Sequence, residues 1–121
     1  MYERILVGTD GSATASKAVA RAVEVAKAQG ASLTILSAGK AAKTGPALEA
    51  AEAAYAGSGV TIDTKAVEGD AVEALVKEAK GYDLLVTGNK GMTGITRFLK
   101  GSVPNKVAHH LPCALLIVKT T

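Results

Sequence analysis

Segments in which the apolar residues have the pattern of a strand alternate along the chain with segments in which they have the spacing of a helix. An apolar run rich in β-branched residues, Tyr2 to Gly8, ends in the turn cluster Gly8-Thr9-Asp10-Gly11-Ser12, which predicts a strand that stops at about residue 8 or 9. From Ser12 the apolar residues recur at helical spacing, which predicts a helix capped by the Ser12 hydroxyl and ended by Gly30. Its predicted buried face consists of Ala15, Ala18, Val19, Ala22, Val23 and Ala26.

The middle of the chain continues the alternation. Ser32 to Ala38 and Val60 to Val67 have strand patterns, and the wetter face of the second is typical of a sheet edge. Between these strands we expect a loop, Gly39 to Gly45, followed by a short helix. We expect that helix to start at Pro46, because proline is favoured in the first helical turn.

Four further predicted elements, two helices and two strands, complete the chain. Gly69-Asp70, with Glu73 three residues on, has the form of a capping box and predicts a third helix whose apolar stripe includes Leu75. Tyr82 to Thr87 is the fourth predicted strand. Ser102 is expected to cap a fourth helix, and Cys113 to Lys119 has the length of a fifth strand.

This order of elements indicates the fold class. Strands and helices alternate, and the first, fourth and fifth strands are almost continuously apolar, which favours a three-layer α/β/α arrangement around an open parallel sheet. Such sheets bind ligands beyond the carboxyl ends of the strands, where the strand order reverses. Gly8, Thr9 and Asp10, and the glycine-rich segment 88–102, therefore become candidate ligand-binding residues.

Composition and charge exclude several classes. The 121 residues fit one domain, residues 1–121, and no apolar run is long enough for a membrane span. The amino terminus enters a strand at once, so we expect no signal peptide and a cytoplasmic location. A single cysteine, Cys113, excludes an internal disulfide. The net charge of +3 is scattered and only four residues are aromatic, so nucleic acid is a poor candidate partner.

The glycine-rich segment has a spacing with a physical use. Gly88, Gly91 and Gly101-Ser102 follow the pattern G-x2-G-x9-G-S. Glycines let backbone N–H groups approach phosphate oxygens, and Ser102 would add a hydroxyl and the positive end of a helix dipole. The alternative is a mobile surface loop, because glycine clusters are common in turns. No Walker-type motif occurs.

Four segments resemble the universal stress protein family in order and spacing, across essentially the whole chain. They are Ile5 to Ser12, Val86 to Gly91, Leu99 to Val103 and Leu115 to Lys119. The resemblance is to the ATP-binding members. It implies an adenine nucleotide alpha hydrolase-like, Rossmann-like sheet of order 3-2-1-4-5, a homodimer paired through the last strand Cys113–Lys119, and a role as a nucleotide-dependent regulator or sensor in the stress response.

The resemblance also implies a site for ATP, with magnesium or manganese bound through its phosphates. Thr9 and Asp10 would contact the adenosine end, Ala38 the base, and Thr87 and Gly88 the ribose and phosphates. The phosphates would be held by Lys90, Gly91, Gly101, Ser102 and Val103. The segment between the second strand and second helix is shorter than is usual in the family, and Ala38 is smaller than the usual aliphatic residue. Some members prefer cyclic AMP, and the sequence leaves the nucleotide open.

We expect a nucleotide-binding protein and not an enzyme. Acyl transfer needs a serine, a histidine and an acid together, and His109 and His110 fall at the far end of the predicted fourth helix. Asp10 is the one acid expected near the site, where it would form a turn or accept a ligand hydrogen bond. The alternatives are a weak ATPase and a nucleotide-free dimeric interaction module.

Overall fold

The computed structural model describes residues 1–89 and 111–120. The predicted fourth helix, the two histidines, and the candidate residues Lys90, Gly91, Gly101, Ser102 and Val103 lie outside the described residues. The described elements are β1 (Arg4–Gly8), α1 (Ala13–Gln29), β2 (Ser32–Ala38), α2 (Ala41–Ala54), β3 (Ile62–Val67), α3 (Ala71–Glu78), the 3₁₀ turn η1 (Ala79–Gly81), β4 (Leu84–Gly88) and β5 (Ala114–Val118).

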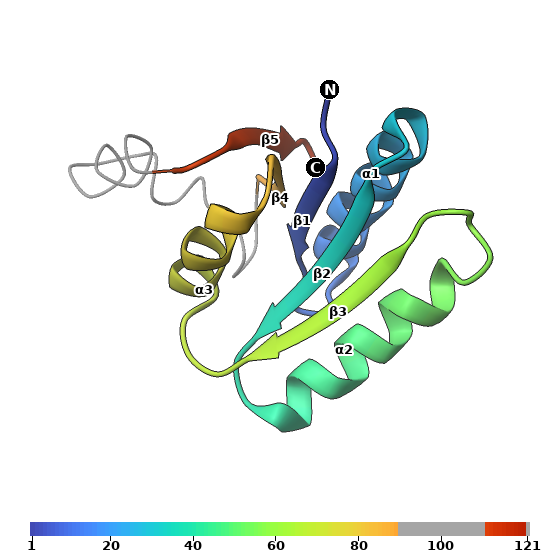
Figure 1. Cartoon of the computed structure of the whole chain (residues 1–121). Helices are drawn as coiled ribbons and strands as arrows, with labels where there is room; N and C mark the ends of the chain where they lie inside the picture. Colours follow the sequence, from blue (N-terminus) through green and yellow to red (C-terminus); the bar gives the residue numbers. More distant parts are fainter. Residues whose placement is uncertain (90–110, 121) are drawn as a thin grey trace.

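Five parallel strands form one sheet of order β3-β2-β1-β4-β5, which confirms the predicted fold class (Figure 1). β1 lies at the centre, where Gly8 is opposite Leu36 of β2 and Val7 is opposite Val86 of β4. The chain passes from β1 to β2 on one side and later reaches β4 on the other. The strand order therefore reverses at β1, and the carboxyl ends of β1, β2 and β4 share one edge.

Two apolar layers cover the sheet, one on each face. On one face α1 and α2 pack against Ile5, Val7 and Ile35, and on the other α3 packs against Leu6 and Leu36. The predicted apolar face of α1 is confirmed, because all six of its residues are buried. Ser12 accepts a hydrogen bond from Ala15 N, and Gly30 ends the helix in the left-handed conformation, as expected.

The predicted start of the second helix is wrong. α2 begins at Ala41, five residues before Pro46, so Gly39 and Lys40 alone connect it to β2. Ala41 and Ala42 are strong helix formers, and Thr44 is already buried in the turn that precedes Pro46. Gly45 has no Cβ to clash with the Pro46 ring, which lets the helix continue through the proline.

Asp83 joins the amino ends of β1 and β4. Its Oδ2 accepts hydrogen bonds from Glu3 N and Arg4 N, both at 2.9 Å. These two bonds lower the pKa of the Asp83 carboxyl below its ordinary value. Its place at the strand entrance, away from the ligand edge, is as the sequence predicts.

Cys113 is half-buried, and burial raises the pKa of its thiol, which favours the unreactive protonated form.

Candidate functional site

A hollow of about 860 Å³ opens at the carboxyl edge of the sheet, within the size range of small-molecule sites. It lies where β2 and β3 end and α2 and α3 begin (Figure 1). Its walls come from three stretches of the chain: the turn after β1, the end of β2 with the first part of α2, and the turn before α3. The lining residues are Asp10, Gly11, Ser12, Ser37, Ala38, Gly39, Lys40, Ala42, Lys43, Pro46, Ala47, Ala50, Gly69, Asp70 and Ala71.

The turn between β1 and α1 is held by its own side chains. Thr9 Oγ1 accepts a hydrogen bond from Gly11 N at 3.1 Å, and Asp10 Oδ1 accepts one from Ser12 N at 2.9 Å. Ser12 then caps α1. These local bonds fix the direction in which Asp10 faces the hollow. They confirm Asp10 as a turn former, and its second carboxylate oxygen has capacity to accept from a ligand.

Gly11 is required where this turn meets α2. Its φ is +82°, and a Cβ added there would lie 3.3 Å from Cβ of Ala47. A side chain at this position would therefore strain the backbone and press on the helix that forms the opposite wall. The absence of a side chain at Gly11 lets this turn and α2, which both line the hollow, lie close together.

The structure brings the described candidate residues to one edge but places them differently. Asp10 and Ala38 line the hollow. Gly8, Thr9, Thr87 and Gly88 are buried at the ends of β1 and β4 and do not belong to its lining. They lie beside the point where the chain leaves β4 for the glycine-rich segment.

Gly8 has a packing role on the face opposite α1. A Cβ at Gly8 would lie 2.8 Å from Cδ1 of Leu75 in α3, so the glycine makes room for that side chain. The prediction that Gly8 contacts a ligand stays a prediction. The structure adds a second reason for a glycine at this position.

The first residue beyond β4 is tied to the end of the chain. Asn89 Oδ1 accepts hydrogen bonds from Thr120 N and Thr120 Oγ1, both at 2.9 Å, and Asn89 N donates to Val118 O at 3.0 Å. Lys17 Nζ in α1 donates to Thr120 O at 3.1 Å. Thr120 is buried. The segment after β5 thus fixes the point from which the glycine-rich segment departs.

Sequence reasoning missed five polar residues of the hollow, namely Ser12, Ser37, Lys40, Lys43 and Asp70. Lys40 and Lys43 were assigned to a loop, and their place in the wall follows from the early start of α2. Asp70 was expected only as a helix cap, which it is, since its Oδ2 accepts from Glu73 N at 3.0 Å. The sequence did hold one signal for these residues. The carboxyl ends of parallel strands share one edge of the sheet, so residues after β2 and β3 lie at the same edge as those after β1.

The charges and dipoles of the hollow favour a polar ligand. Two lysines and two aspartates line it, and the amino-terminal ends of α1, α2 and α3 all contribute to its walls. The positive ends of helix dipoles favour negative ligand groups. The first turn of α2 also lacks a side-chain cap, so its N–H groups receive no such hydrogen bond. The arrangement can hold an anionic molecule with a neutral polar portion.

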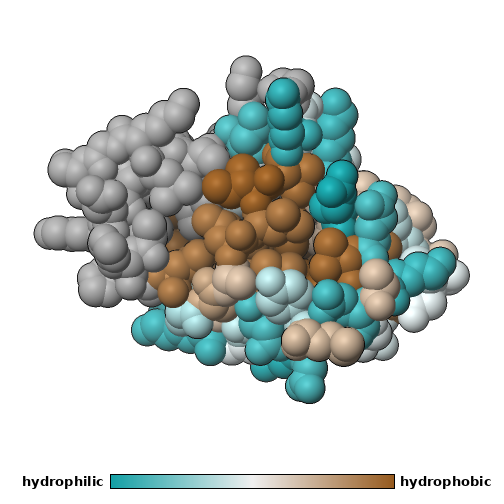
Figure 2. All heavy atoms as spheres, turned by 90° about the horizontal axis from the view of Figure 1, so that it is seen from above, coloured by the Kyte–Doolittle hydropathy of each residue, from teal (hydrophilic) through white to brown (hydrophobic). Residues whose placement is uncertain are grey.

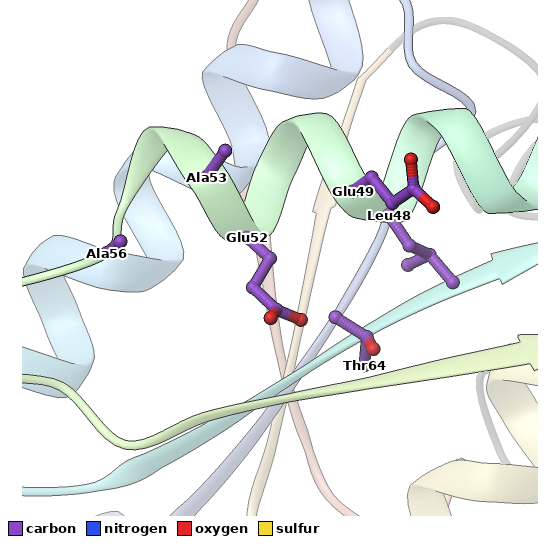
Figure 3. A pocket seen from close by; sticks show the side chains of 6 residues that line it. All are labelled: Leu48, Glu49, Glu52, Ala53, Ala56 and Thr64. Atoms are coloured by element: carbon purple, nitrogen blue, oxygen red, sulfur yellow. The ribbon is translucent and has the colours of Figure 1, made fainter.

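A second hollow, of about 270 Å³, lies between α2 and β3 (Figure 3). Glu52 points from the helix toward Thr64 of β3, and Glu49 and Leu48 lie one turn earlier on the helix. The two carboxylates repel anions, and the hollow lies away from the β1–β4 reversal.

Among residues 1–89 and 111–120, no group of three acidic, histidine or cysteine side chains can hold a metal ion. None of the described helices is both long enough and apolar enough to span a bilayer.

Comparison with known proteins shows what the chain is related to. The family model described as "Universal stress protein family" matches residues 1–54 and again residues 37–119. The two matches overlap across the region where β2 leads into α2.

Individual relatives match over nearly their full length. Universal stress protein YxiE of Bacillus subtilis is 31% identical across 98% of this chain and 100% of its own. Universal stress protein Rv1636 of Mycobacterium tuberculosis is 35% identical across 99% of this chain and 98% of its own. The alignment with the Bacillus protein extends over 148 positions, more than the 121 residues present here, so that relative carries residues without a counterpart in this chain.

Solved structures give the same result. A universal stress protein in complex with cAMP is 40% identical, with a TM-score of 0.81 and coverage of 99% of this chain and 98% of the other. The structure of Rv1636 from Mycobacterium tuberculosis gives a TM-score of 0.66 at 38% identity, with 99% and 97% coverage. With the sheet order and the matching family model, these comparisons show that the chain belongs to the universal stress protein family.

Proposed function

We propose that this protein binds an adenine nucleotide at the carboxyl edge of its sheet and acts as a nucleotide-dependent regulator, not as an enzyme. The observation that carries the proposal is the hollow of about 860 Å³ beside the strand-order reversal, lined by Asp10 and Ala38. Open parallel sheets bind their ligands at this place. The base and sugar would occupy the hollow, and the phosphates would extend toward the segment that follows β4.

ATP is the first candidate. The spacing of Gly88, Gly91 and Gly101-Ser102 would supply backbone N–H groups suited to a chain of phosphates. Magnesium or manganese would bind through phosphate oxygens, as these ions favour substrate oxygens over a full protein cage. Lys40 and Lys43, exposed on the hollow's wall, would attract the anionic ligand at long range without contacting its phosphates.

Cyclic AMP is the second candidate, and a specific observation favours it. The 40% identical structure with a TM-score of 0.81 is a complex with cAMP. Cyclic AMP shares the base and sugar with ATP and carries one phosphate. Both ligands fit the same placement of the base, so the choice between them depends on the phosphate end.

We also propose a homodimer paired through the last strand. In the described part of the chain β5 pairs on one side only, with β4. Leu115 and Leu116 of β5 are half-buried, and Ile117 is 37% exposed. Seen from above, apolar side chains gather over β5 (Figure 2). A second copy of the strand would cover this apolar edge and pair its free backbone groups. Size-exclusion chromatography with light scattering measures the assembly directly.

Calorimetry tests the nucleotide proposal. Purified protein is titrated with ATP and magnesium, with ADP and with cyclic AMP, and phosphate release is followed over hours. Binding without turnover supports the proposal, steady turnover favours the weak ATPase, and no heat with any ligand favours a nucleotide-free dimeric module.

Two glycine variants sharpen the calorimetric test. Gly101→Val is expected to abolish binding, because its side chain would block close approach of phosphate. Gly81→Val is the control, since Gly81 lies at the opposite edge and an added Cβ there meets Arg4 only at 3.7 Å. Normal ATP binding by Gly101→Val would show that the phosphates lie elsewhere.

A further inference from the structure

Ser37 is a buried residue of the hollow's lining whose hydroxyl has no hydrogen-bond partner among residues 1–89 and 111–120. The residue is the last but one of β2, and only 2% of its surface is exposed. Its Oγ forms no hydrogen bond with any residue in the described ranges, unlike two other buried hydroxyls at or near this sheet. Thr34 Oγ1 accepts from Tyr82 Oη at 2.9 Å, and Thr9 Oγ1 accepts from Gly11 N at 3.1 Å.

A hydroxyl that is almost entirely buried and has no protein partner keeps few hydrogen bonds to water, which is unfavourable. An alanine at position 37 would fill the same place in the strand without that cost. No side-chain oxygen or nitrogen in the described residues is both sealed from solvent and unpaired. The Ser37 hydroxyl therefore keeps some accessible surface, and Ser37 belongs to the lining of the hollow.

We propose that the Ser37 hydroxyl hydrogen-bonds the base of the bound nucleotide and contributes to base selectivity. This inference rests on the proposed function. The sheet order supports the base as its partner: β2 lies on one side of β1, and β4, with the glycine-rich segment after it, lies on the other. A ligand whose phosphates extend toward that segment has its opposite end, the base, over β2.

The chemistry of the pair is specific. A serine hydroxyl donates one hydrogen bond and accepts others, so it can pair with a ring nitrogen or with the amino group of adenine. A site with a buried polar group discriminates against ligands that leave this group unpaired. Ala38, the next residue, supplies only a small apolar contact. Ser37 thus gives this end of the hollow a directional contact that Ala38 cannot provide.

Two variants separate a binding role from a structural one. Ser37→Ala removes the unpaired hydroxyl, and Thr34→Val removes a hydroxyl of the same strand that has a protein partner. Affinities for ATP and for adenosine, which has the base but no phosphate, are measured by calorimetry. The thermal midpoint of each ligand-free variant is measured as well.

We expect Ser37→Ala to weaken both ATP and adenosine by about 5- to 10-fold, with a thermal midpoint equal to or above that of the wild type. Thr34→Val is expected to show the reverse, a lower midpoint with unchanged affinities. Unchanged affinities in Ser37→Ala would overturn the inference. If Ser37→Ala weakens ATP but not adenosine, the hydroxyl contacts the phosphates, and the inference is overturned. The inference is also overturned if the wild type binds ATP but not adenosine. If the wild type binds no adenine nucleotide, the proposed function itself fails.

Discussion

Gly11→Ala is the substitution whose effect the structure defines most closely. Two costs add. An L-residue at the observed φ of +82° is strained by about 1–2 kcal/mol. The new Cβ would also lie 3.3 Å from Cβ of Ala47 and 3.7 Å from its Cα, so α2 must shift by a few tenths of an ångström at a cost of up to about 1 kcal/mol. We expect the free energy of unfolding to fall by about 2 kcal/mol.

Gly30→Ala separates the two costs. Gly30 has a φ of +66°, and an added Cβ there meets nothing within 4 Å, so this variant carries the backbone strain alone, about 1 kcal/mol. Urea denaturation followed by circular dichroism gives both values. Nucleotide affinity should fall in Gly11→Ala, because the turn that presents Asp10 moves, and should stay unchanged in Gly30→Ala at the far end of α1. A Gly11→Ala protein as stable as the wild type would refute the reasoning.

Three other changes have defined outcomes. Pro46→Ala should raise the free energy of unfolding by about 1–3 kcal/mol, because it restores an N–H that can reach the carbonyl of Ala42 and removes the ring clash inside α2; a urea midpoint below that of the wild type would contradict this. Asn89→Ala should lower the free energy of unfolding by about 1–3 kcal/mol, because it leaves the buried Thr120 N–H and hydroxyl without their acceptor; Glu24→Ala, an exposed change on α1, is the control. The lowered pKa of Asp83 gives a stabilisation that is complete above its ordinary pKa of 3.8 and is lost as the pH falls through the lower folded-state value. Asp83→Asn should therefore be less stable than the wild type at pH 7, and the gap should close in acid; a constant gap in urea midpoints across this range would contradict the assignment.

The sequence predicted the bounds of a helix correctly where several local signals agree. In α1 the apolar period, the Ser12 cap and the Gly30 stop all point to the same boundaries, and the structure confirms each. The strands follow because a sheet covered on both faces requires nearly continuous apolar runs. The resemblance, and not the pattern alone, gave the strand order.

The start of α2 could not be predicted because two rules conflict there. Proline favours the first helical turn, whereas Ala41 and Ala42 favour a helix five residues earlier. Where the helix starts depends on tertiary packing, because Ala47 and Leu48 of α2 are buried in the fold. The wall formed by Lys40 and Lys43 was missed for the same reason. The Ser37 hydroxyl, which has no partner in the part of the chain that the structure describes, has no signal in the sequence, because only the folded chain shows which polar groups pair with each other.

The early start of α2 bears on how the site binds its ligand. In this chain two residues join β2 to α2, so the wall that carries Lys40 and Lys43 is the first turn of a helix. A helical wall is already ordered before the ligand arrives, and binding then loses less conformational entropy than the closure of a flexible segment would. The lysines remain exposed to solvent, so their attraction for an anion is screened by salt. If the proposed nucleotide binds here, we expect base recognition inside the hollow, which salt hardly affects, to account for most of the selectivity, and the charges at its rim to act mainly by attraction.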